Sequence, residues 1–319
     1  QLEVVLGSDG RLRHLEIAGL RERRHNPFYR RPVRRWLTRL RTFWRGYRLA
    51  ESELVGRLVM DTYQEVAPAL AMVLQLLCHL EVYLTARSFA ETARDRGLEV
   101  CLPEIGTGSP LEVRGLFNPL LLALTERPVP SDVTMGGAPS IALVTGPNSG
   151  GKTRLLQAVG ITQVLGQSGL YVPCAAARLP LVDGLFASII ELDRADQKEG
   201  RLGTELVRLR TLFETVPSGS VVLLDELCSG TNPSEAIEIV DMVLRLLGKL
   251  RPVAFVTTHF LDFAAELGRR TPADGLRFLQ VDVDPGLGST YRFIPGVAST
   301  SLAVGTAHRL GVKIGRAHV

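Results

Sequence analysis

Apolar residues recur at helical spacing over the stretch Ala50–Arg96. This spacing predicts a long helical region that Pro68 kinks or divides and that Gly97 closes. The weaker alternation of residues 1–18, on either side of the turn Gly7–Gly10, predicts a hairpin. The apolar positions of the helical region are Leu54, Leu58, Val59, Tyr63, Val66, Leu70, Val73, Leu74, Leu77, Leu80, Leu84 and Phe89.

Short, continuous apolar runs dominate the remainder of the chain. The runs at 141–144, 221–224 and 253–256 do not alternate, which is typical of parallel strands buried on both faces. Helical spacing returns between these runs, at 154–159 and 205–213. Strands that alternate with helices predict an α/β fold, in which a mixed, mainly parallel sheet is flanked by helices. The long helical region precedes this fold.

A glycine-rich loop follows the first of these strands and opens a helix. It fits the pattern G-x-x-x-x-G-K-[ST], in the strand–loop–helix context that makes the pattern informative. Its residues are Gly146, Pro147, Asn148, Ser149, Gly150, Gly151, Lys152 and Thr153. Glycines let backbone N–H groups converge on one anion, and the helix N-terminus adds a positive dipole end. We expect Lys152 to reach the β- and γ-phosphates of a nucleoside triphosphate and Thr153 to ligate Mg²⁺.

Polar residues also follow the two later strands. Asp225 and Glu226 come directly after the run 221–224. An acid at a buried strand end fits the role of holding Mg²⁺, which we assign to Asp225, and Glu226 is placed to orient or deprotonate the attacking water. The run 253–256 leads to His259, where an imidazole can hydrogen-bond a γ-phosphate. The predicted catalytic set is therefore Glu226, Lys152 and His259.

The segment Arg21–Arg48 is the most biased part of the chain. It holds eleven arginines and one acid, Glu22, and so carries a formal charge of +10 in a chain of net charge +4. Six of the nineteen aromatic residues also lie in it. Arginine interleaved with aromatic residues suits contact with the phosphates and bases of nucleic acid, and it also suits the headgroup layer of a membrane. A structural helical face is the third interpretation, and the sequence leaves all three open.

The composition, with 45% hydrophobic and 22% charged residues, is typical of a globular protein. The longest candidate for a membrane span, Val66–Cys78, is interrupted by Pro68 and Gln75. We therefore expect no stable membrane insertion and a cytoplasmic location. The four cysteines are widely spaced without a CxxC pair, so we expect reduced thiols rather than a disulfide or metal set.

Both ends of the sequence have the character of cut ends. The chain opens with Gln1 in mid-pattern, and its last six residues resemble a translated sequencing adapter. We expect residues 314–319 to be a non-native tail. The remainder divides into residues 1–97, an N-terminally truncated region with the basic arm and long helices, and residues 98–313, which carry the predicted nucleotide site.

The motifs in this order resemble the ATPase domain of the MutS family, a branch of the ABC-type ATPases. The resemblance covers about residues 70–312, and it implies an ABC-type P-loop fold, ATP as substrate and Mg²⁺. It also implies a nucleotide contact near Phe117 and a homodimer with composite ATP sites. The segments that carry the resemblance are Gly146–Thr153, Leu223–Leu227, Gly230-Thr231 and Thr257–His259, supported by Gly169–Cys174, Leu181–Phe186 and Ile294–Ser299.

Several segments depart from the family pattern. Where the family carries a Ser-Thr signature that reaches the partner's γ-phosphate, this chain has Glu199–Glu205, of which only the end at Glu205-Leu206 matches well. Gly200, Thr204 or a helix N-terminus could still bind an anion there. The base-contact segments near Phe117 and Ser131 are altered as well. The acids after the second strand, with Asn232–Glu235, are closer to the second bacterial branch, which acts on recombination intermediates or stalled ribosomes.

The predicted function is that of a Mg-dependent ATPase of the MutS type. It would bind DNA, with Arg21–Arg48 as a contact, and rearrange a dimer in mismatch repair or recombination control. One alternative is a nucleotide-gated scaffold that binds nucleic acid or ribosomes with little turnover. Another is an ABC-type module of a transporter or an SMC-like protein, although the Leu-Ser-Gly-Gly-Gln signature of such modules is absent.

Overall fold

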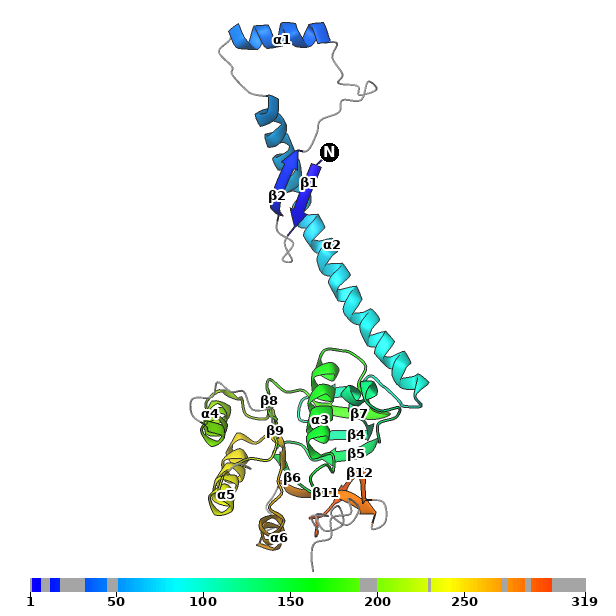
Figure 1. Cartoon of the computed structure of the whole chain (residues 1–319), viewed down its shortest axis with the longest axis vertical. Coiled ribbons are helices and arrows are strands. Elements are labelled where there is room, and N and C mark those ends of the chain that lie inside the picture. Colours follow the sequence, from blue (N-terminus) through cyan, green and yellow to red (C-terminus); the bar gives the residue numbers. More distant parts are fainter. Residues whose placement is uncertain are drawn as a thin grey trace, which may run out of the picture. The chain divides into compact units, whose positions relative to one another are not determined.

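A computed structural model of the chain divides into two compact units, residues 1–84 and 85–319 (Figure 1). The residues whose structure is described are 2–6, 12–17, 32–44, 51–189, 200–228, 231–270, 275–284 and 288–299. Several predicted features lie outside the described residues. They are the parts of the arm Arg21–Arg48 before residue 32 and after residue 44, the signature residue Glu199, Gly230 and the tail 314–319.

The first unit begins with the predicted hairpin. Strands β1 (Leu2–Leu6) and β2 (Leu12–Ile17) pair antiparallel, with Leu2 opposite Ile17, which confirms that prediction. Helix α1 (Pro32–Trp44) lies within the basic arm, and the unit also contains the first part of helix α2 (Glu51–Asp95).

Helix α2 runs through Pro68 without a break, so this proline does not divide the predicted helical region. Its stretch Val59–Asp95 is long and apolar enough to cross a membrane by length and composition, and it is the one such stretch among the described residues. The sequence analysis did not expect such a stretch, because it took Pro68 and Gln75 as interruptions. The helix continues past both residues. Length and composition alone are weak evidence for a span, and the absence of membrane insertion stays a prediction.

The end of α2 packs into the second unit. Gly97 adopts a left-handed conformation, with φ of 69°, and its N–H donates to the carbonyl of Arg94 at 2.8 Å. This is the glycine termination expected from the sequence. Ala93, Leu98 and Phe117 form a small buried cluster there.

The main sheet of the second unit has six strands in the order β12-β11-β6-β10-β9-β8. Strands β11, β6, β10, β9 and β8 run parallel to one another, and the edge strand β12 pairs antiparallel with β11. The strands are β6 (Ser140–Thr145), β8 (Leu185–Ser188), β9 (Val221–Leu224), β10 (Val253–Thr257), β11 (Leu276–Asp284) and β12 (Gly288–Pro295). The predicted strands at 141–144, 221–224 and 253–256 are therefore three adjacent strands at its centre.

A second sheet has the order β3-β7-β4-β5, in which β3 and β7 are parallel and the other pairs antiparallel. Its strands are β3 (Glu104–Gly106), β4 (Leu111–Leu116), β5 (Ser131–Met135) and β7 (Ala176–Pro180). A 3₁₀ helix, η1 (Pro119–Ala123), connects β4 towards β5. The unit is thus a mixed α/β structure with two mixed sheets.

Alternate residues of the central strands supply two cores. On β6, Ala142 and Val144 face a core shared with α3 (Lys152–Gln167) and the second sheet, whereas Ile141 and Leu143 face a core shared with the remaining helices. Those helices are α4 (Gly200–Thr215), α5 (Pro233–Leu250) and α6 (Leu261–Arg270). Burial on both faces explains why these strands are continuously apolar. It also leaves only the strand ends available for polar chemistry.

Candidate nucleotide site

The glycine-rich loop connects the end of β6 to the start of α3. Gly146 has φ of 147°, and a Cβ placed on it would lie 2.5 Å from Cγ2 of Val281 on β11. Gly151 has φ of 92° and is the N-cap residue of α3. Both positions require glycine, the first because space and backbone conformation exclude a side chain and the second because φ is positive. The loop therefore presents the N-terminus of α3 with its free N–H groups.

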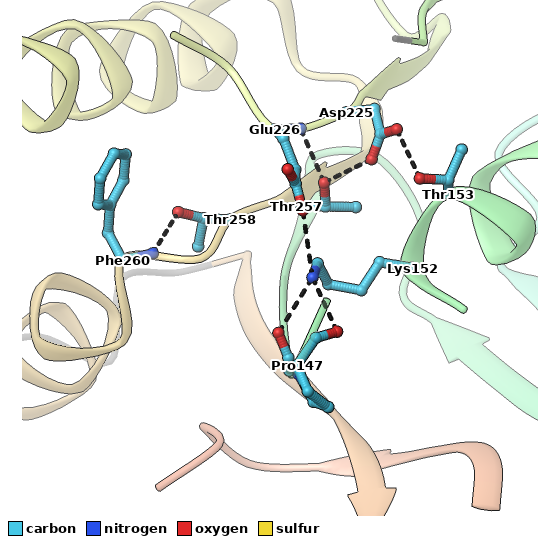
Figure 2. Close-up of polar contacts among 9 residues, drawn as sticks. Pro147, Lys152, Thr153, Asp225, Glu226, Thr257, Thr258 and Phe260 are labelled. Carbon is cyan, nitrogen blue, oxygen red and sulfur yellow. Dashed lines mark hydrogen bonds and ion pairs between the residues drawn. The ribbon is translucent and has the colours of Figure 1, made fainter. Parts of the chain in front are cut away.

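Lys152 is the first residue of α3 and is 4% exposed. Its ammonium group donates to the carbonyl oxygens of Gly146 at 3.0 Å and Pro147 at 3.2 Å. It also lies 3.2 Å from Oε1 of Glu226, as Figure 2 shows. The buried cation is thus satisfied within the chain by two carbonyls and one carboxylate.

Asp225 accepts one hydrogen bond from the first turn of α3 and another from the end of β10. Thr153 Oγ1 donates to Oδ2 of Asp225 at 2.7 Å, and Thr257 Oγ1 donates to Oδ1 at 2.7 Å. The same Thr257 hydroxyl accepts a hydrogen bond from the backbone N–H of Glu226 at 2.8 Å (Figure 2). The strand order explains this arrangement, because β10, which ends at Thr257, lies between β6 and β9. The Thr257 hydroxyl therefore joins β10 to the end of β9, and Asp225 carries the link on to Thr153 of α3.

Glu226 lies just beyond the end of β9 in a left-handed conformation, with φ of 43°. This conformation is uncommon for a residue with a side chain. Two contacts hold it, the backbone hydrogen bond to Thr257 and the ion pair with Lys152. The carboxylate is one-fifth exposed, with a side-chain exposure of 21%, so it borders solvent while Asp225, at 3%, does not.

The donor set suits Mg²⁺ bound together with phosphates. The hydroxyl of Thr153 and the carboxylate of Asp225 are hard oxygen ligands, and their hydrogen bond already brings them together. Among the described residues there is no cluster of three or more His, Cys, Asp or Glu that could hold a metal by itself. Mg²⁺ commonly takes one or two protein oxygens and completes its shell with water and substrate phosphates, so these two residues fit it.

A cavity of about 820 Å³ opens beside this group and extends away from it along α3. Lys152, Thr153 and Glu226 line one part of it, and Tyr291 and Phe293 of β12 supply its aromatic surface. The rest of the lining comprises Leu116, Asn118, Leu121, Thr125, Arg127, Pro128, Val129, Ser131, Asn148, Ser149, Gly150, Gly151, Arg154, Leu155, Gln157 and Ala158. The volume lies in the range typical of small-molecule and cofactor sites.

Asn118 fixes one wall of this cavity. It is 5% exposed and caps η1, where its Oδ1 accepts from the N–H of Leu120 at 2.9 Å. Its Nδ2 donates to the carbonyl of Arg154 and to Oε1 of Gln157, each at 3.0 Å. The loop that bears η1 is thereby tied to the first turns of α3. Arg127, farther along this loop, donates to the carbonyl of Gly97 at 3.0 Å.

The structure brings together four predicted residues, Lys152, Thr153, Asp225 and Glu226, but it places two others elsewhere. Phe117 is 1% exposed, packs 6.4 Å from the ring of Phe89, and does not line the cavity. His259 is exposed, its ring lies 4.1 Å from that of Phe260 at an interplanar angle of 44°, and it does not line the cavity either. Their roles in nucleotide contact stay predictions.

The departing signature segment lies in the first turns of α4, where Gly200 is the first helical residue. Glu205 accepts a hydrogen bond from the backbone N–H of Cys228 at 2.8 Å, so this acid braces the chain just after Asp225 and Glu226. Burial raises the pKa of the Cys228 thiol to about 11, and the nearby Glu205 carboxylate adds to this effect. Glu205, the part of this segment that matches the family, thus has a structural role within this chain through its hydrogen bond with Cys228.

Two residues of the site were missed by the sequence analysis. Thr257 was noted only as part of a motif, although a hydroxyl at the end of one strand could have been expected to bond the acids at the end of a neighbouring strand. Tyr291 gave no sequence signal, because its place at the cavity depends on the antiparallel pairing of β12 with β11. Its ring lies against the loop, with Cδ1 3.5 Å from where a Cβ on Gly151 would stand.

A family model described as MutS domain V matches residues 142–312 of the chain. The endonuclease MutS2 of Thermomicrobium roseum is 30% identical over 280 residues, which cover 84% of this chain and 35% of that protein. The endonuclease MutS2 of Thermus thermophilus is 31% identical over 268 residues, covering 83% and 34%. That of Ligilactobacillus salivarius is 27% identical over 272 residues, covering 84% and 34%. The chain thus spans about a third of the length of these relatives.

Thr257→Val tests the hydrogen-bonded link between the strand ends. Valine keeps the shape but leaves Oδ1 of Asp225 and the N–H of Glu226 without the bonds they make to Thr257, so we expect the free energy of unfolding to fall by about 2–3 kcal/mol. Thr257→Ser retains the hydroxyl and should lose less than half as much. Urea unfolding of both variants measures the difference. A valine variant as stable as the serine variant would show that the link contributes nothing.

Proposed function

The chain belongs to the MutS family, in its second, MutS2 branch, and we propose that its second unit binds ATP with Mg²⁺ and hydrolyses it. Domain V of the family is an ATPase domain. The observation that carries the proposal is the meeting of Lys152 and Thr153 with Asp225 and Glu226 at one edge of the sheet. The glycine-rich loop, the parallel sheet order and the acids at a strand end also support an ABC-type P-loop fold.

The residues take distinct parts in the proposed reaction. Lys152 and the loop N–H groups would hold the β- and γ-phosphates and stabilise the charge that develops between them. Thr153 and Asp225 would ligate Mg²⁺, which neutralises phosphate charge when bound. The γ-phosphate would replace Glu226 as a partner of Lys152, which leaves the carboxylate free to orient the attacking water. His259 would contact the γ-phosphate from the end of β10.

The cavity suggests where the base of the nucleotide would lie. Phosphates bound at Lys152 would place the base towards the part of the cavity that contains Tyr291 and Phe293. An aromatic ring can stack on a purine. We therefore assign base contact to Tyr291 in addition to the predicted region near Phe117, whose neighbour Asn118 lines the cavity.

The wider function rests on the family relationship and on the basic arm. We propose that the whole protein is cytoplasmic, binds DNA in part through Arg21–Arg48, and forms a homodimer with composite ATP sites. The expectation of a role in mismatch repair is corrected, since the MutS2 branch is not a mismatch-repair branch. The family assignment likewise removes the alternative of a transporter or SMC-like module. A scaffold with little turnover remains the alternative, and the rate of hydrolysis distinguishes it.

Glu226→Gln tests the proposed hydrolysis. The variant should bind Mg-ATP at least as tightly as the native chain, because Lys152 loses a competing carboxylate. Its steady-state hydrolysis should fall about 10²–10⁴-fold, the usual contribution of a positioned general base. Phosphate release and titration with a fluorescent ATP analogue measure the two quantities. Glu238→Gln, at an exposed acid on α5, is the matched control. Equal turnover in the Glu226 and Glu238 variants would contradict the role of Glu226.

Tyr291→Ala tests the assignment of the base. Loss of one stacking ring should weaken ATP binding by about 10- to 100-fold, whereas the affinity for inorganic tripolyphosphate should not change. Tyr291→Phe keeps the ring and should bind both ligands as the native chain does. Calorimetric titration in the presence of Mg²⁺ supplies the affinities. If the alanine variant lost affinity for both ligands equally, Tyr291 would act on the loop and not on the base.

A salt series tests the proposed DNA contact. Binding through Arg21–Arg48 releases counterions, so log affinity should fall with log salt with a slope of about −0.9 for each phosphate contacted. Replacing the arm arginines by glutamine should flatten this slope. A slope unchanged by the arm substitutions would assign the arm a structural role.

Light scattering in the same buffers with Mg-ATP gives the oligomeric state. A mass that stays that of a monomer when Mg-ATP is added would contradict the proposed composite ATP sites.

A further inference from the structure

Two cysteines far apart in the sequence meet at the edge of the second unit's core. The Sγ atoms of Cys101 and Cys174 lie 3.7 Å apart, and both residues are free thiols. Cys174 is fully buried, whereas Cys101 is partly exposed. The sequence analysis expected unconnected thiols because the cysteines show no local pairing pattern. The four cysteines are free thiols, as expected, and the structure adds that these two lie in contact.

The backbone holds the two thiols at this distance. Cys101 forms an isolated antiparallel bridge with Val172, in which the N–H of Val172 donates to the carbonyl of Cys101 at 2.8 Å and the N–H of Cys101 donates back at 3.3 Å. The N–H of Cys174 donates to the carbonyl of Val172 at 2.9 Å. Both cysteines are therefore fixed to the same residue. Cys101 packs against the core cluster to which Val172 and Cys174 belong.

The surroundings differentiate the two thiols. The hydrogen bond shared with Cys174 lowers the pKa of Cys101 below its ordinary value. The pKa of Cys174 is raised by its hydrogen bond with Cys101 and by burial. The more exposed sulfur, that of Cys101, is thus the one that more readily forms a thiolate, and the buried sulfur of Cys174 lies in contact with it. This is the arrangement of an attacking thiol with a resolving thiol beside it.

We propose that Cys101 and Cys174 are an oxidation site at which a low-molecular-weight disulfide converts the two thiols into an intramolecular disulfide. The Cys101 thiolate attacks the external disulfide, forms a mixed disulfide and releases one small thiolate. Cys174 then gives up its proton to solvent and attacks the Cys101 sulfur, which releases the second small thiolate. The protein loses two protons and two electrons, and the external disulfide takes up both to become two thiols. The sulfur atoms need to approach by only about 1.7 Å to reach bonding distance.

The disulfide would join a segment that precedes α3 in the sequence to the segment that follows it. Cys101 follows the end of α2 by a few residues, and Cys174 lies in the segment after α3, the helix that begins at Lys152. A cross-link between them closes a long loop of chain, which restricts the unfolded state. The oxidised protein should therefore have a higher melting temperature than the reduced protein.

The other two cysteines provide internal controls. Cys228 is buried and its pKa is raised to about 11, so it should react slowly at neutral pH. Cys78 is exposed on α2 and could form adducts or join two chains. The experiment is therefore done on the full chain with Cys78→Ser, which removes this competing reaction and leaves the proposed pair intact.

Incubation of this chain with oxidised glutathione tests the proposal. Intact mass should fall by two hydrogens with no glutathione retained, and non-reducing peptide mapping should join the peptides that contain Cys101 and Cys174. Addition of Cys174→Ala should leave glutathione attached at Cys101, and Cys101→Ser should abolish the reaction. Dithiothreitol should restore the original mass and lower the melting temperature again.

Two results would overturn the proposal. The first is a chain that keeps glutathione on Cys101 although Cys174 is present, which would show that the buried thiol cannot resolve the mixed disulfide. The second is a chain whose mass does not change, which would show that Cys101 is not attacked. Neither result bears on ATP binding, so the oxidation site stands or falls separately from the proposed function.

Discussion

The hydrogen bonds of Asp225 with Thr153 and Thr257 are the contacts on which the site depends. They join residues from the helix after β6, from the end of β9 and from the end of β10, which lies between those two strands. Because Asp225 is 3% exposed, its carboxylate could not remain there without these partners. The position and backbone conformation of Glu226 then follow from the same Thr257 hydroxyl.

The sheet makes this arrangement possible by burying both of its faces. Side chains of β6, β9 and β10 alternate between a core with α3 and a core with α4, α5 and α6. The polar residues Lys152, Asp225 and Thr257 are nevertheless buried, and they gather at one edge of the sheet where the strands end. Rigid strands on a dry core hold such side chains more precisely than flexible loops would.

The sequence predicted the central strands because buried parallel strands are unbroken apolar runs. It assigned Lys152, Thr153, Asp225 and Glu226 to one nucleotide site from the glycine-rich motif and from the acids that follow an apolar run. Other features depend on pairings that no local pattern encodes. The second sheet is built from short strands distant in the sequence, and Tyr291 reaches the cavity only through an edge strand. Phe117 was expected at the nucleotide from the family resemblance, yet its ring is buried and packs against Phe89. Cys101 and Cys174 meet through a single bridge residue.

The ion pair between Lys152 and Glu226 has a consequence for the electrostatics of the site. Glu226 serves as an internal counter-ion of Lys152, so the glycine-rich loop and this pair together carry little net charge. Under the proposed function, nucleotide binding would exchange anions, with a phosphate displacing the Glu226 carboxylate from Lys152. A neutral phosphate ester or a single weak anion gains little from such an exchange. Only a ligand with several charged oxygens, carrying its own divalent cation, compensates for the contact that is lost.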